Sequence, residues 1–78
     1  NSSVEDLLDE ALLTAAINTF LATLPAINRH IFVRRYWYVS SISDIAKQYD
    51  MSESKVKSML FRLRKQLKSH LEKEGFFV

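Results

Sequence analysis

The stretch between positions 53 and 73 concentrates side chains that can bind an anion. It holds seven lysines and arginines against two acids, whereas the first ten residues hold four acids and no base. This separation of charge points to a polyanion that meets the C-terminal half of the chain. A solvated helix face with no ligand would be the plainer explanation. The candidate contact residues are Ser54, Lys55, Lys57, Ser58, Phe61, Arg62, Lys65 and Lys68.

The residue types in this set suit double-stranded DNA. Lys57 and Arg62 are long cations that can reach guanine acceptors or phosphate oxygens, and Ser58 can hydrogen-bond to either. Phe61 can press on a thymine methyl group. Packing against the aliphatic stems of the neighbouring lysines is the alternative use of this ring. The residues expected to contact phosphates are Arg64, Lys65 and Lys68.

The helices that must carry these residues are marked by two serines. Ser41 precedes Asp44 by three positions, and Ser52 precedes a run with an acid in its first turn. A serine before a helix accepts a hydrogen bond from a free backbone N–H, so both serines predict helix starts. The helix between them is short and ends at Asp50 and Met51. A short helix, a tight turn and a longer basic helix make a helix-turn-helix.

The rest of the chain completes one small all-α domain, predicted to span residues 1–78. Ser2 and Ser3 are alternative caps for a first helix, and Pro25 suits the first position of a second. Helices are expected over 4–23, 25–37, 42–49 and 53–72. The apolar stripe of the last helix should pack against Ile31 and Ile45. Its members are expected to be Val56, Leu60, Leu63 and Leu67.

Several functional classes are excluded by composition. The 78 residues include one glycine and no cysteine, so a glycine-rich phosphate loop, a disulfide framework and a cysteine-ligated metal are excluded. His30 is expected on a helix surface and His70 on a flank of the basic helix, without the convergent groups that catalysis needs. We expect neither cofactor nor metal. No apolar run approaches the roughly 18 residues of a membrane span, which predicts a soluble cytoplasmic protein. The missing initial methionine suggests that the natural protein is longer.

Three segments of the sequence also resemble a known family. They are Leu24-Pro25 with the residues up to Val33, Ser41 to Ala46, and Met51 to Leu67. Together they are similar to region 4 of bacterial sigma-70-family RNA polymerase sigma factors, in particular the extracytoplasmic-function-like group. The resemblance covers about residues 10–71.

The resemblance implies a four-helix domain that reads the minus-35 promoter element in the major groove and binds the β-subunit flap of RNA polymerase. It places Lys57, Ser58, Phe61 and Arg62 at DNA-contacting positions. An anti-sigma factor is a further implied partner. The wide apolar surface of the first helix indicates either burial on several sides, which is the simpler explanation, or a spare apolar face for a partner. In the second case, the first two helices would offer a groove for a polymerase helix. Its candidate lining residues are Leu13, Phe20 and Phe32.

Val39 and Asp50 depart from the family pattern, which often has glycine at these positions. Asp tolerates a left-handed backbone conformation, whereas a β-branched valine does not. The loop around Val39 is therefore expected to take another shape. Two alternatives to a sigma domain remain open at this point, a stand-alone LuxR-type regulator and a helical protein-interaction module. Salt-dependent duplex binding separates the module from both DNA-binding candidates, and binding to a β-flap fragment separates sigma domain from regulator.

Overall fold

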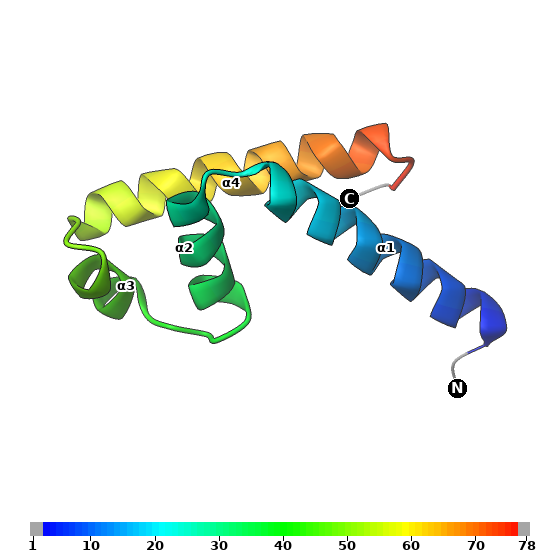
Figure 1. Cartoon of the computed structure of the whole chain (residues 1–78), viewed down its shortest axis with the longest axis horizontal. Coiled ribbons are helices and arrows are strands. Elements are labelled where there is room, and N and C mark those ends of the chain that lie inside the picture. Colours follow the sequence, from blue (N-terminus) through cyan, green and yellow to red (C-terminus); the bar gives the residue numbers. More distant parts are fainter. Residues whose placement is uncertain (1–2, 77–78) are drawn as a thin grey trace.

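The computed structural model describes residues 3–76 and contains four α-helices joined by short loops (Figure 1). They are α1 (Val4–Thr23), α2 (Ala26–Tyr36), α3 (Ile42–Gln48) and α4 (Glu53–Lys73). The predicted all-α fold is confirmed, and no strand occurs in the part of the chain that is described. Pro25 lies just before α2 as its N-cap, with an extended ψ of 148°, and not inside the helix as expected.

Serine side chains cap three of the four helices. Ser3 forms a capping box with Asp6, in which each side chain accepts a hydrogen bond from the other's backbone N–H, at 3.1 and 3.3 Å. Ser3 is therefore the cap of α1, while Ser2 lies outside the described residues. Ser41 and Ser52 accept backbone hydrogen bonds of 3.0 and 3.1 Å at the starts of α3 and α4. The caps confirm the helix starts at 41 and 52 that the sequence predicts.

The core lies where α2 and α3 pack against the first half of α4 (Figure 1). Its largest fully buried side chains are Ile31, Ile45, Val56, Leu60 and Leu63. The predicted packing stripe is confirmed for three of its four members. The fourth, Leu67, is only half-buried because it lies in a shallow hollow at the edge of α4, beyond α3. Met59, three positions after Val56 on the same helix face, is buried and was missed.

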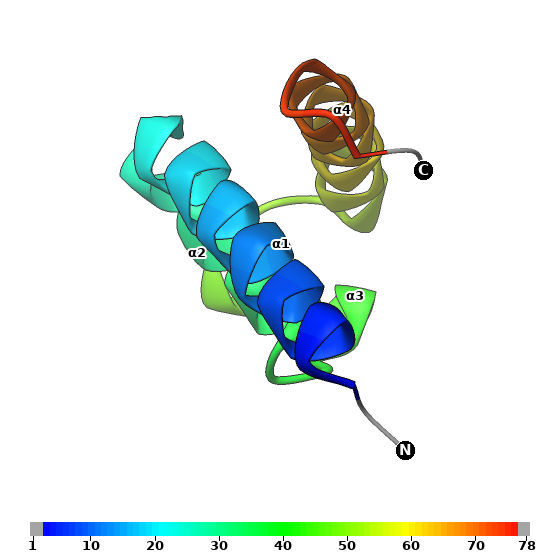
Figure 2. The same cartoon turned by 90° about the vertical axis from the view of Figure 1, so that its right-hand side faces the viewer.

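The first half of α1 projects away from the body of the domain (Figures 1 and 2). Its side chains from position 4 to position 12 are all exposed. Burial begins toward the end of the helix, where Ala16, Phe20 and Leu21 join the buried side chains. The helix is therefore held to α4 only by its C-terminal half.

Gly75 ends α4 in the left-handed conformation that glycine adopts at low cost, with a φ of 93°. The backbone N–H of Phe76 donates to the Leu71 carbonyl oxygen at 2.8 Å and closes the helix end. Phe76 then lines hollows beside α1. This residue therefore folds back onto the domain, whereas Phe77 and Val78 lie outside the described part.

The loop before α3 contradicts the expectation for Val39. Its φ is 54°, so the valine takes the left-handed conformation typical of glycine, as does Asp50 in the next turn at 53°. Two hydrogen bonds hold the following residue, Ser40. Its N–H donates to the Arg34 carbonyl oxygen and its own carbonyl oxygen accepts from the Arg35 guanidinium, both at 3.0 Å. These bonds hold the loop and hence the strained valine.

Val39→Gly should raise the free energy of unfolding by about 0.5–1 kcal/mol. The left-handed conformation costs a non-glycine residue roughly 1–2 kcal/mol, and the greater freedom of glycine in the unfolded chain offsets about half of this gain. The Val39 side chain is 79% exposed, so little packing is lost. Urea denaturation measures the change, with Val39→Ala as the control that keeps the strain. A glycine variant no more stable than the alanine variant would show that the conformation costs little.

Candidate nucleic-acid interface

The eight predicted contact residues are all exposed, and all of them lie on α4. They are Ser54, Lys55, Lys57, Ser58, Phe61, Arg62, Lys65 and Lys68. The opposite side of the same helix is buried at Val56, Leu60 and Leu63. At a rise of about 1.5 Å per residue, the set extends over roughly 21 Å of helix. One helix therefore presents a continuous polar and basic face to solvent while its other face anchors it to the domain.

The turn between α3 and α4 fixes the direction in which this face points. Ala46 is buried, and its small side chain allows the two helices to approach closely. The N–H of Met51 donates to the Ala46 carbonyl oxygen at 2.9 Å, and Asp50 supplies the left-handed residue that reverses the chain. Ile45 and Val56 then meet in the core. This arrangement is a helix-turn-helix in which α4 is the exposed second helix.

Phe61 lies at the centre of the basic face with 54% of its surface exposed. The Lys65 ammonium nitrogen lies 5.2 Å from the centre of its ring, within cation–π distance. The packing alternative for this ring is therefore present, but more than half of the residue's surface remains exposed. The ring remains available for an apolar contact with a base.

A cation from α2, which the sequence interpretation missed, joins the edge of this face. Arg35 lines a hollow of about 250 Å³ together with Lys57 and Arg64 of α4. The Arg64 guanidinium donates a 2.8 Å hydrogen bond to the Tyr36 hydroxyl, which holds it toward α2. Three cations thus meet where α2 borders α4. The pair of adjacent arginines at 34 and 35 was the available signal in the sequence.

The three residues predicted to line a partner groove lie in different environments. Phe20 and Phe32 are 5% and 4% exposed and pack edge to face in the core, with ring centres 6.4 Å apart. They stabilise the domain and are not available to line an open groove. Leu13 is half-buried and lines a hollow of about 600 Å³ between α1 and the end of α4.

His70 connects α4 to α1 instead of flanking the exposed basic face. Its Nε2 lies 3.0 Å from the Ala16 carbonyl oxygen, which can only accept, so this nitrogen carries the proton. The ring also lies 5.7 Å from the centre of the Phe20 ring. His30 is exposed on α2, as expected. Among residues 3–76 no group of side chains could hold a metal ion, and no helix is long and apolar enough to cross a membrane.

A family model described as "Sigma-70, region 4" matches residues 14–67. The chain belongs to this family. No curated protein and no solved structure gives a significant match. The matched span contains α2, α3 and most of α4, including every candidate contact residue except Lys68.

Membership assigns the sigma region 4 domain a role in transcription initiation. It is a DNA-binding helix-turn-helix domain, which acts with promoter DNA and RNA polymerase, and the region is not a catalytic one. The exposed face of α4 combines hydrogen-bond donors, cations and one apolar ring, which are the kinds of side chain that contact phosphates and base edges in protein–DNA complexes.

Proposed function

We propose that this sigma region 4 domain reads the minus-35 promoter element by placing the first turns of α4 in the major groove. The observation that supports the proposal most directly is the joint exposure of Lys57, Ser58, Phe61 and Arg62 on the second helix of the motif. A second helix of this kind meets base edges with its N-terminal part. The buried side of α4 anchors the helix to the domain, so that this face of the helix always points to solvent.

In this proposal the contacts divide into base-reading and phosphate-binding groups. Arg62 and Lys57 donate to guanine acceptors, and Phe61 contacts a thymine methyl group. Phosphate contacts come from the later turns of α4 and from the edge that Arg35 and Arg64 share. These contacts set the position of the helix along the duplex and carry no sequence information directly.

Selection of preferred duplexes from a random pool tests the proposal. The domain should enrich one short sequence, and binding should weaken steeply as salt concentration rises. The matched control is a selection with the domain carrying Lys57→Ala, Phe61→Ala and Arg62→Ala together, which should still bind duplex DNA but enrich nothing. Salt-dependent binding without enrichment by the unaltered domain would show that α4 contacts phosphates alone.

We also propose that the hollow beside Leu13 receives the β-subunit flap of RNA polymerase. Leu12, Leu13 and Phe76 give it apolar surface, and Asp9, Glu10 and Glu74 give it an acidic rim. Such a surface suits a helix with apolar and basic side chains. Titration with a flap-helix peptide should shift the NMR signals of Leu13, whereas shifts confined to α4 would reject this surface.

The remaining assignments follow from the same proposed role. A factor that binds promoter DNA and polymerase works in the cytoplasm, and the resemblance points to the extracytoplasmic-function-like group. An anti-sigma factor would act by covering either α4 or the hollow beside Leu13.

A further inference from the structure

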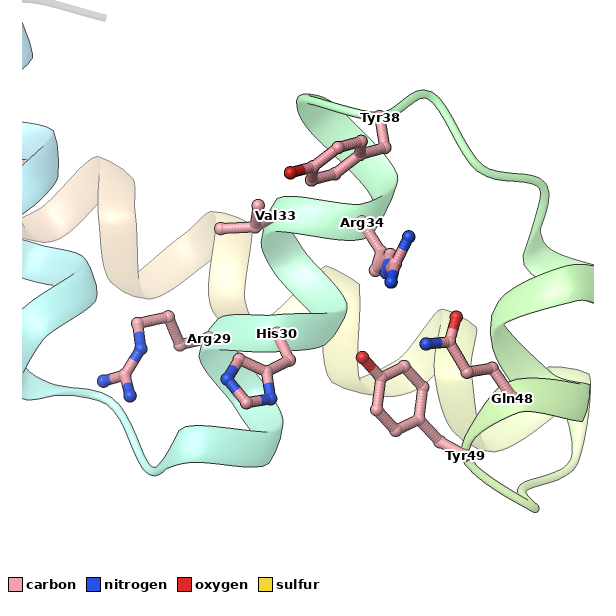
Figure 3. Close-up of a pocket in the computed structure, with 7 residues that line it drawn as sticks. All are labelled: Arg29, His30, Val33, Arg34, Tyr38, Gln48 and Tyr49. Atoms are coloured by element: carbon pink, nitrogen blue, oxygen red, sulfur yellow. The ribbon is translucent and has the colours of Figure 1, made fainter.

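A second cationic site lies between α2 and α3, apart from the exposed face of α4 (Figure 3). It is a hollow of about 580 Å³. Its lining residues are Arg29, His30, Val33, Arg34, Tyr38, Gln48 and Tyr49. None of them is acidic and none belongs to α4. All of α2 lacks an acid, so no carboxylate on this helix offsets its basic side chains.

The polar groups of the hollow converge. Figure 3 shows the Arg34 guanidinium, the Gln48 amide and the Tyr49 hydroxyl directed into the same space, with the His30 ring at its edge. The Arg34 guanidinium carbon lies 5.1 Å from the centre of the Tyr38 ring. A guanidinium carries five N–H donors, so this contact with one ring still leaves donors that can reach an acceptor.

The lining also contains apolar surface. Val33 and the rings of Tyr38 and Tyr49 contribute it, so the site suits a ligand that is anionic and partly apolar. A bare inorganic anion would leave most of the hollow empty. The phosphates of a duplex held on the outer face of α4 lie on the far side of α2, because α4 runs behind this helix in Figure 3.

We infer that this hollow binds an acidic segment of a partner protein, one that presents carboxylates together with an apolar or aromatic side chain. The carboxylates accept from Arg34 and its polar neighbours, and the apolar side chain lies against the two tyrosine rings. Because no α4 residue lines the site, the segment and a promoter duplex can occupy the domain together. The inference does not depend on which bases α4 reads.

A peptide that alternates paired glutamates with leucine and tyrosine provides the probe, and the same peptide with glutamine in place of glutamate is its control. Arg34→Gln should weaken binding of the acidic peptide about tenfold, since a hydrogen bond between charged groups is lost. Lys47→Gln removes the same charge from an exposed position on α3 outside the hollow and should change binding less than twofold. Both variants should keep the duplex affinity of the unaltered domain, and peptide should still bind when duplex is saturating.

Tyr49→Phe gives an independent measurement if Arg34→Gln unfolds the domain, which circular dichroism would reveal. It removes one hydroxyl group from the hollow and keeps the ring, so it should weaken binding of the acidic peptide about threefold. The inference would be overturned if Lys47→Gln weakened peptide binding as much as Arg34→Gln, or if the glutamine peptide bound as tightly as the glutamate peptide. Displacement of the peptide by an equal concentration of inorganic phosphate would also overturn it. Self-association of the domain that Arg34→Gln abolishes would also overturn it, because the hollow would then hold a second copy of this chain.

Discussion

Leu60→Ala should lower the free energy of unfolding by about 2–5 kcal/mol. Leu60 is 1% exposed and lies among Ile31, Ile45 and Val56, so the shorter side chain loses buried apolar surface and leaves a cavity. A domain of this size is stable by only about 5–15 kcal/mol, so the variant should show a large fall in its urea midpoint.

Leu8→Ala is the matched control for this substitution. Leu8 lies on α1 with most of its surface exposed, so the same chemical change should alter stability by less than about 0.5 kcal/mol. Urea denaturation followed by circular dichroism compares the two variants. Similar losses in both would mean that the buried stripe of α4 does not form the core.

Arg62→Ala should weaken binding to the selected duplex by about 1–3 kcal/mol and relax the preference for one base pair. Arg62 is exposed beside Phe61 near the middle of the basic face, where a guanidinium can make paired hydrogen bonds to guanine. Fluorescence anisotropy with the selected and scrambled duplexes measures both effects. The loss should be larger on the selected duplex.

Lys68→Ala is the control, because it removes a cation from the same face six residues, or about 1.7 turns, farther along α4. It should weaken both duplexes alike and reduce the dependence of log affinity on log salt by about one. Equal losses on the two duplexes for Arg62→Ala would assign that residue to phosphate binding.

Most of the fold could be predicted because its determinants are local. Serine caps mark where three helices begin, and apolar spacing identifies the inner face of α4. The exposed positions on the opposite face follow from the same helical period. The exposure of all eight candidate residues is therefore expected once α4 is in place, whereas their contact with DNA remains a prediction.

The features that were missed depend on contacts between helices. Helical periodicity places Phe20 and Phe32 on the apolar faces of their own helices, but it does not predict that the two rings contact each other in the core. The same limit applies to Arg35, which reaches the α4 edge only because α2 crosses there, and to the cationic hollow between α2 and α3. Val39 differs again: the hydrogen bonds around Ser40 outweigh the valine's own conformational preference.

The projecting half of α1 divides the domain into two levels of stability. Its first turns can unwind and re-form without disturbing a core that begins at Ala16. The free energy of that local opening is set by helix propensity and by the Ser3–Asp6 box, not by global unfolding. Backbone amides there would exchange with solvent hydrogen at a rate that core mutations such as Leu60→Ala leave unchanged. A ligand that bound this segment in its helical form would have to offset the conformational entropy lost on ordering it, because contacts with the rest of the domain do not.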